Sequence, residues 1–300
     1  MIFQGMGVAL VTPFNEDGSV DFISLRRLIE YQLSQQIDFF VLHGSTGESA
    51  CIMSDERAEI IRFVVELVNH RKPIVVGLGS NCTQSLVQRA QELESMNIDA
   101  ILSVVPYYNK PSQEGIFLHF KALAESTSLP IILYNIPGRT GVNMTPDTTV
   151  RLANNCKNIV AVKEASGIVM QVKQIVEGGS PKDFTVLSGD DNLSIQFMEV
   201  GAKGVISVIG NAFPSAFHRL IHAQAQGDYE LAAKIQEIFK EMYKLLFVCG
   251  NPAGIKCLLY HQGLIAHNKV RLPLTPVNHD TEQLIIEEYH KVRQALESIL

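Results

Sequence analysis

The segment Ile159-Val160-Ala161-Val162-Lys163-Glu164 is a short apolar run that ends in two charged residues. Its apolar residues are consecutive instead of alternating with polar ones, which is typical of a strand covered on both faces of a parallel sheet. Similar runs occupy residues 7–12, 38–43, 74–79, 99–105, 130–135, 184–189 and 204–209. The sequence therefore predicts eight buried strands.

Segments with helical spacing of apolar residues lie between these runs, as in the set Leu86, Ala90 and Leu93. Thr145-Pro146 is a typical helix start, with a capping hydroxyl before a proline. Eight strand-helix units fit a closed parallel barrel better than an open doubly wound sheet, which usually has five or six strands. We predict an α/β fold: a (β/α)8 TIM barrel over residues 1–226 and a C-terminal helical domain over residues 227–300, where helical periodicity replaces strands.

The composition excludes several classes of protein. Of the 300 residues 46% are hydrophobic, which is too many for a disordered chain. No apolar run approaches the roughly 18 residues that a membrane span needs. A net charge of −6 and the lack of a run of basic residues do not indicate binding to nucleic acid. Five cysteines without Cys-x-x-Cys spacing suggest neither disulfides nor zinc, and the first residues lack the basic segment of a secretion signal. We expect a soluble, cytoplasmic protein.

Lys163 is the first candidate for chemistry, because it follows four apolar residues near the end of a predicted strand. In barrels of this class the active site lies where the strands end. Burial lowers the pKa of an amine, so that part of it is neutral and can attack a carbonyl to form a Schiff base. The alternative is a lysine whose stem is buried and whose ammonium reaches solvent.

The other strand ends carry groups that suit this chemistry. Tyr134, Tyr108, Ser45 and Thr46 offer hydroxyls for the proton transfers of Schiff-base formation. Arg139, in a Pro-Gly-Arg-Thr-Gly turn, could bind a carboxylate with both arms of its guanidinium, or it could be a surface arginine paired with a local acid. The backbone amides of residues 44–47 could also bind an anion.

Three further motifs are weak. Gly77-Leu78-Gly79 begins like a dinucleotide loop, but Cys82 stands where the third glycine should be. His218 and His222 have the i, i+4 spacing of two metal ligands, yet no recognised motif ties a carboxylate to them, and we interpret them as a solvated helix face. Asp190-Asp191-Asn192 is interpreted as a helix cap. We predict no cofactor and no metal.

These motifs, in this order, resemble the pyruvate-dependent aldolase superfamily that includes dihydrodipicolinate synthase and N-acetylneuraminate lyase. The resemblance runs from residues 7–14 through 272–276 and is most specific at residues 106–115, Pro-Tyr-Tyr-Asn-Lys-Pro-Ser-Gln-Glu-Gly. It implies that Lys163 forms the Schiff base with pyruvate. Tyr134 would move protons around the imine, and Tyr108 and Ser45 would complete its proton relay.

The resemblance also implies the substrate-binding residues. Thr46 would hold the pyruvate carboxylate, and Gly189 and Ile206 would line the pocket. Arg139 would meet the carboxylate of L-aspartate 4-semialdehyde, the second substrate. The implied product is 4-hydroxy-tetrahydrodipicolinate, on the way to diaminopimelate and lysine. The implied assembly is a homotetramer, a dimer of dimers, in which Tyr107 or Tyr108 reaches a neighbouring site.

Two alternative functions remain open. One is an N-acetylneuraminate lyase or 2-keto-3-deoxy sugar acid aldolase that uses the same imine on a longer substrate, and Ser45, where the synthase usually has threonine, is similar to the lyase. The other is a 2-oxo-acid sensor without turnover. In lysine-inhibited members the positions of Ser54, Arg57 and Ser85 carry two histidines and a glutamate. We therefore expect weak inhibition by lysine.

Overall fold

The structure is a computed structural model that describes residues 3–299. Its eight strands close into one barrel in chain order, from β1 to β8. The strands are β1 (Gly5–Ala9), β2 (Phe39–Leu42), β3 (Ile74–Gly77), β4 (Ala100–Val104), β5 (Ile131–Asn135), β6 (Ile159–Glu164), β7 (Thr185–Ser188) and β8 (Gly204–Ser207). The predicted (β/α)8 barrel is confirmed.

Seven strands lie within the predicted runs, and β6 matches its run from end to end. The first strand differs most, because it begins at Gly5 instead of residue 7 and ends at Ala9 instead of residue 12. The Gly5 amide donates to the Lys203 carbonyl at 2.9 Å, which extends the pairing toward the N-terminus. At the other end the Thr12 hydroxyl donates to the Gly47 carbonyl at 2.8 Å, so Thr12 contacts the loop after β2 and is not part of the sheet.

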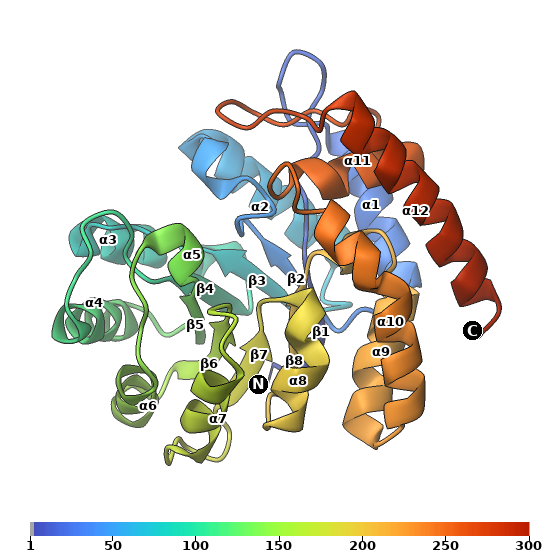
Figure 1. Cartoon of the computed structure of the whole chain (residues 1–300). Helices are drawn as coiled ribbons and strands as arrows, with labels where there is room; N and C mark the ends of the chain where they lie inside the picture. The colour runs from blue at the N-terminus through green and yellow to red at the C-terminus, as the bar shows by residue number, and fades with distance from the viewer. Residues whose placement is uncertain (1–2, 300) are drawn as a thin grey trace. The chain divides into compact units, whose positions relative to one another are not determined.

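The chain forms two compact units. The first contains the residues up to Gly5 and Pro73–Ile206. Its neighbouring helices pack in chain order, with α4 against α3 and α6, and α6 against α7 (Figure 1). Its helices are α3 (Thr83–Leu93), η2 (Glu94–Met96), α4 (Gln113–Ser126), α5 (Pro137–Thr140), α6 (Pro146–Asn155), α7 (Val169–Glu177), η3 (Asp191–Leu193) and α8 (Ser194–Glu199). The predicted cap at Thr145 is confirmed, since its side chain accepts from the Thr148 amide.

The second unit contains Met6–Lys72 and the chain from Ser207 onward. Figure 1 shows α10 lying beside α9, and α10 also packs against α12. The helices are α1 (Phe22–Ser34), η1 (Ser49–Cys51), α2 (Ser54–Val68), η4 (Ile209–Asn211), α9 (Pro214–Gln226), α10 (Tyr229–Leu245), α11 (Ala253–His261) and α12 (His279–Glu297). The C-terminal helices are confirmed, and residue 226 is where α9 ends; the domain boundary placed there stays a prediction.

Within residues 3–299, none of the helices combines the length and the apolar character that crossing a membrane requires. The strands are almost entirely buried. Six of them, β1, β2, β3, β5, β7 and β8, contain only buried residues, and β4 and β6 contain one half-buried residue each. Such strands need cover on both faces, which helices provide in this class of fold.

Candidate active site

Lys163 is the penultimate residue of β6, and the register of the sheet pairs it with Tyr134 on β5. Paired residues of neighbouring strands point to the same face of the sheet. The Lys163 ammonium nitrogen lies 4.5 Å from the centre of the Tyr134 ring. Both side chains are 6% exposed. The structure therefore brings together the predicted imine-forming lysine and the predicted proton-transfer tyrosine.

The pKa of Lys163 is lowered to about 8, chiefly because burial penalises the charged ammonium. Nearby charges act in both directions. The Asp191 and Asp190 carboxylates raise the pKa, whereas the Arg139 guanidinium lowers it. A lysine with this pKa has a substantial neutral fraction near neutral pH, which is what attack on a carbonyl requires. Of the two interpretations of Lys163, the structure favours the buried amine.

Gly189 leaves room for the Lys163 side chain. Its amide donates to the Glu164 carbonyl at 2.7 Å, so it continues the pairing of β7 with β6. A Cβ atom at this position would lie 3.0 Å from Cε of Lys163 and 2.7 Å from Cβ of Ala165. Real Cβ atoms essentially never come closer than 3.0 Å to another atom, and a contact at 3.0 Å is tighter than nearly all real ones. Any larger residue at position 189 would therefore displace the lysine or its neighbours.

Glu164, which the sequence analysis did not single out, anchors the ends of β5 and β6. Its carboxylate is fully buried and accepts hydrogen bonds from two side chains: Asn135 Nδ2, at 3.1 Å to each oxygen, and Gln171 Nε2, at 3.0 Å. It also accepts from the Ser166 backbone N–H at 2.8 Å. Burial raises its pKa, and these donors oppose the rise. Because Asn135 and Glu164 are paired one residue beyond Tyr134 and Lys163, this network holds the two strand ends in register.

Asp190 and Asp191 have two roles. The Asp190 side chain accepts from the Asn192 amide at 3.1 Å and caps η3, which confirms the interpretation of this motif as a helix cap. Asp191 is 6% exposed, and both carboxylates act on the charge of Lys163. The electrostatic role was not predicted, because the sequence analysis interpreted this motif only as a helix cap.

The remaining predicted residues of the first unit lie in different environments. Arg139 is exposed on the short helix α5. Ile206 is fully buried in β8. Tyr107 is 40% exposed and Tyr108 is 88% exposed, and Tyr108 has a left-handed backbone with φ of 74°. A large, exposed aromatic residue in a strained conformation is unusual for a residue that serves only to pack a loop.

Ser45 and Thr46 lie in the second unit, in a tight turn after β2. The Gly47 amide donates to the Gly44 carbonyl at 3.1 Å, and the Glu48 amide donates to the Ser45 carbonyl at 3.1 Å. The Thr46 hydroxyl is buried and accepts from Asn251 Nδ2 at 2.9 Å. The segment that leads into α11 therefore orients the Thr46 hydroxyl, a contact that the sequence analysis did not predict.

Lys256, on α11, is a second buried lysine. It is 0% exposed, and its ammonium donates to the Glu48 carboxylate at 2.5 Å and to the Lys269 carbonyl at 2.8 Å. Burial lowers its pKa to about 8, although Glu48 opposes the change. Burial therefore does not distinguish the reactivity of the two lysines. Their partners do, because Lys256 is held in an ion pair with a buried carboxylate, which favours its charged form. Lys163 is the better nucleophile on this ground.

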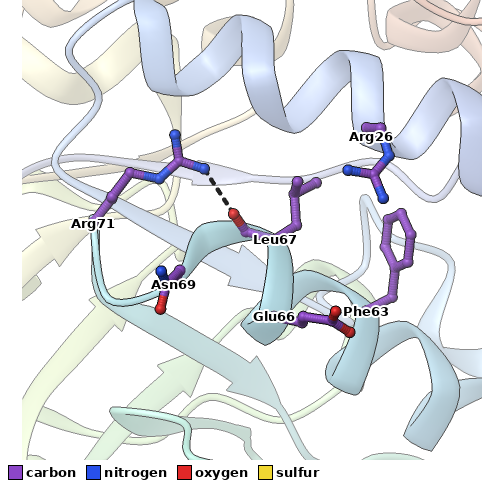
Figure 2. Close-up of a pocket in the computed structure, with 6 residues that line it drawn as sticks. All are labelled: Arg26, Phe63, Glu66, Leu67, Asn69 and Arg71. Carbon is purple, nitrogen blue, oxygen red and sulfur yellow. Dashed lines mark hydrogen bonds between the residues drawn. The ribbon is translucent and has the colours of Figure 1, made fainter.

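A surface pocket of about 280 Å³ lies between α1 and α2. Figure 2 shows its lining residues, which are Arg26, Phe63, Glu66, Leu67, Asn69 and Arg71. Arg71 Nη2 donates to the Leu67 carbonyl at 2.7 Å, which ties the end of α2 to the following loop (Figure 2). None of the predicted site residues lines this pocket.

Comparison with known proteins identifies the family. A model of the dihydrodipicolinate synthetase family matches residues 2–291. The 4-hydroxy-tetrahydrodipicolinate synthase of Porphyromonas gingivalis is 54% identical over 291 residues, which cover 97% of this chain and 98% of that protein. The solved structure of the synthase from Methylacidiphilum fumariolicum SolV is 40% identical, with a TM-score of 0.95 over 99% of this chain and 98% of its own.

A second solved structure, that of the chloride-inhibited dihydrodipicolinate synthase from Acinetobacter baumannii complexed with pyruvate, is 37% identical. It superimposes with a TM-score of 0.93 and covers 97% of this chain and 99% of that one. The family match and the relatives span nearly the whole length on both sides. The chain therefore belongs to the dihydrodipicolinate synthetase family.

Proposed function

We propose that this chain condenses pyruvate with L-aspartate 4-semialdehyde, through a Schiff base on Lys163, to give 4-hydroxy-tetrahydrodipicolinate. The observation that carries the proposal is the buried Lys163, whose pKa is lowered to about 8 and whose ammonium lies 4.5 Å from the ring of Tyr134. Membership of the family and the names of its relatives support the reaction. The pyruvate complex of the Acinetobacter baumannii relative supports the first substrate.

In the proposed mechanism the neutral Lys163 amine attacks the carbonyl carbon of pyruvate. Loss of water from the resulting carbinolamine gives the imine, and loss of a proton from the pyruvate methyl group gives an enamine. The enamine carbon then attacks the aldehyde, which forms the new carbon–carbon bond and regenerates the iminium, while the aldehyde oxygen takes a proton. The amino group that came with the semialdehyde attacks the iminium carbon, which closes the ring and expels the Lys163 amine. Because the iminium accepts the electron pair when the methyl group loses its proton, a metal ion is not needed as the Lewis acid.

Each predicted residue has a role in this proposal. Tyr134 supplies and removes protons at the imine, and the hydroxyls of Ser45 and Tyr108 continue the relay. Thr46 and its neighbouring amides hold the pyruvate carboxylate. The tight backbone turn at Ser45 and the hydrogen bond from Asn251 to the Thr46 hydroxyl support these roles, because they hold both hydroxyls in defined positions.

Arg139 binds the carboxylate of the aldehyde in this proposal, and Gly189 and Ile206 shape the pocket. The position of Arg139 supports its role, because its guanidinium is on the surface and its charge lowers the pKa of Lys163. The contact distance that a Cβ at position 189 would have to Lys163 supports the role of Gly189.

We further propose a homotetramer, a dimer of dimers, and a cytoplasmic location, as expected from the sequence. The exposure of Tyr107 and Tyr108 supports an assembly in which a tyrosine from one chain serves the site of another. A Tyr108→Phe variant in that case loses catalytic rate but keeps its oligomeric state, because the ring remains while the hydroxyl is removed. Light scattering coupled to size exclusion separates the two effects.

The acceptor aldehyde is best tested by competition among substrates. Labelled pyruvate is offered with L-aspartate 4-semialdehyde, N-acetylmannosamine or glyceraldehyde, and the products are weighed by mass spectrometry. We expect kcat/KM for the semialdehyde to exceed that for either sugar by at least about 100-fold, because binding of the second carboxylate depends on a charge-assisted pair. Comparable use of a sugar acceptor would identify a lyase or sugar acid aldolase instead. Imine formation without any condensation would identify a 2-oxo-acid sensor.

A further inference from the structure

Asp38, His218 and His222 form a cluster that the proposed reaction does not use. Asp38 directly precedes β2, and the two histidines lie one turn apart on α9. Their side chains are 27%, 17% and 36% exposed. The interpretation of His218 and His222 as a solvated helix face is therefore wrong, because both rings turn toward a carboxylate that the sequence places 184 positions before His222.

The distances in this cluster suit a shared metal ion. The Asp38 Oδ2 atom lies 2.9 Å from Nε2 of His222 and 3.8 Å from Nε2 of His218. Tetrahedral zinc with nitrogen and oxygen ligands at about 2.0–2.1 Å separates adjacent ligand atoms by about 3.3 Å. The two distances lie on either side of that value. All three ligand atoms lie within 4.8 Å of one another.

The surroundings of the cluster hold the ligands in place. The Met6 amide donates to Asp38 Oδ2 at 2.7 Å, a contact of the kind that orients carboxylate ligands in metal sites. Nε2 of His222 approaches the same oxygen at 2.9 Å, so the carboxylate is held between α9 and the Met6 backbone.

The histidine rings stack with their centres 3.9 Å apart and their planes at 28°. This arrangement leaves Nε2 of each ring within 4 Å of Asp38 Oδ2. One divalent cation can satisfy both nitrogens and the carboxylate at once, while hydrogen bonding to a single oxygen leaves His218 at 3.8 Å, too far for a hydrogen bond.

A second cluster of potential ligands, Cys257, His261 and Glu282, serves as a contrast. Burial raises the pKa of the Cys257 thiol to about 12, so it resists the deprotonation that metal binding requires. This cluster is the poorer metal site of the two.

We propose that Asp38, His218 and His222 bind a divalent first-row transition metal ion, with zinc as the best match, and that water fills the fourth position. Asp38 lies at the amino end of β2, whereas Ser45 and Thr46 follow its carboxyl end. In barrels of this class the amino ends of the strands serve stability and the carboxyl ends serve catalysis. The ion ties α9 to the start of β2 and takes no part in turnover.

The test is zinc binding to the whole protein, measured by equilibrium dialysis with zinc chloride after exhaustive chelation. We expect one zinc ion per chain. The His218→Gln and His222→Gln variants keep a polar side chain but lose the imidazole, and each should weaken binding by at least about tenfold, since loss of a supporting group alone costs that much in metal sites. His261→Gln is the matched control and should bind zinc as the unaltered protein does.

Two further measurements accompany the dialysis. Zinc should raise the midpoint of thermal unfolding of the unaltered protein, and of the His261→Gln variant, but not that of the double variant at positions 218 and 222. Turnover should be the same with and without chelator. The proposal is overturned if the unaltered protein binds no zinc at micromolar concentration, if the double variant binds it equally well, or if His261→Gln abolishes the binding.

Discussion

The lowered pKa of Lys163 sets how fast the imine forms at each pH. With a pKa of about 8, about one-tenth of the amine is neutral at pH 7, against about one part in 3,000 for a lysine at its ordinary value. The neutral fraction rises as the pH rises through the pKa. Between pH 7 and pH 9 we expect imine formation to become about tenfold faster and then to level off, whereas an ordinary lysine would gain about a hundredfold with no plateau.

Single-turnover experiments with pyruvate measure this rate directly. Enzyme and pyruvate are mixed at each pH and quenched at fixed times into borohydride, and the fraction of chains that carry the reduced adduct is measured by mass spectrometry. Because the reduction takes place after the quench, its own pH dependence does not enter the rate. A rate that still rises tenfold per pH unit at pH 9 would show that burial of Lys163 does not control its reactivity.

Two variants test the sign of the local charges. Removing the Asp191 carboxylate in Asp191→Asn should move the profile to lower pH, because Asp191 raises the pKa of Lys163. Removing the guanidinium in Arg139→Gln should move it to higher pH, because Arg139 lowers that pKa. Shifts of both variants in the same direction would contradict the assignment of these charges.

Three other predictions follow from the site. Gly189→Ala should destabilise the fold by about 1–3 kcal/mol in urea unfolding and slow pyruvate trapping, because its Cβ would press on Lys163 and Ala165; unchanged values for both would contradict the packing argument. Arg139→Ala should raise KM for the semialdehyde while trapping of pyruvate at pH 9 stays intact, and equal loss of both would place Arg139 in the pyruvate site. Free lysine should inhibit weakly or not at all in a steady-state titration, because Ser85 is neutral where sensitive relatives have an acid and Arg57 adds positive charge; cooperative inhibition at micromolar lysine would show otherwise.

The strands could be predicted because burial on both faces leaves a local mark, a run of consecutive apolar residues. Lys163 could be predicted as a candidate for the same reason, because it interrupts such a run. The register that pairs Tyr134 with Lys163 could not be predicted, because register depends on contacts between strands that sequence spacing does not show.

The contacts that sequence reasoning missed join distant segments. Glu164 depends on Gln171 and Asn135, which come from α7 and β5, and Lys256 finds Glu48 from 208 positions away. The available signal was a charged residue inside an apolar stretch, since a buried charge requires a partner. That signal marks the residue but does not name its partner, which only the fold supplies.

The central claim, that Lys163 forms the imine, is tested most directly by reducing the enzyme–pyruvate complex with borohydride and locating the added mass by peptide mapping. Lys256 is the internal rival, because its pKa is also lowered to about 8, although Glu48 holds it in an ion pair. The account predicts one pyruvate-derived adduct per chain, on the peptide that contains Lys163, and no adduct in a Lys163→Ala variant. An adduct on Lys256 or on any other lysine would contradict it, and so would the absence of any adduct.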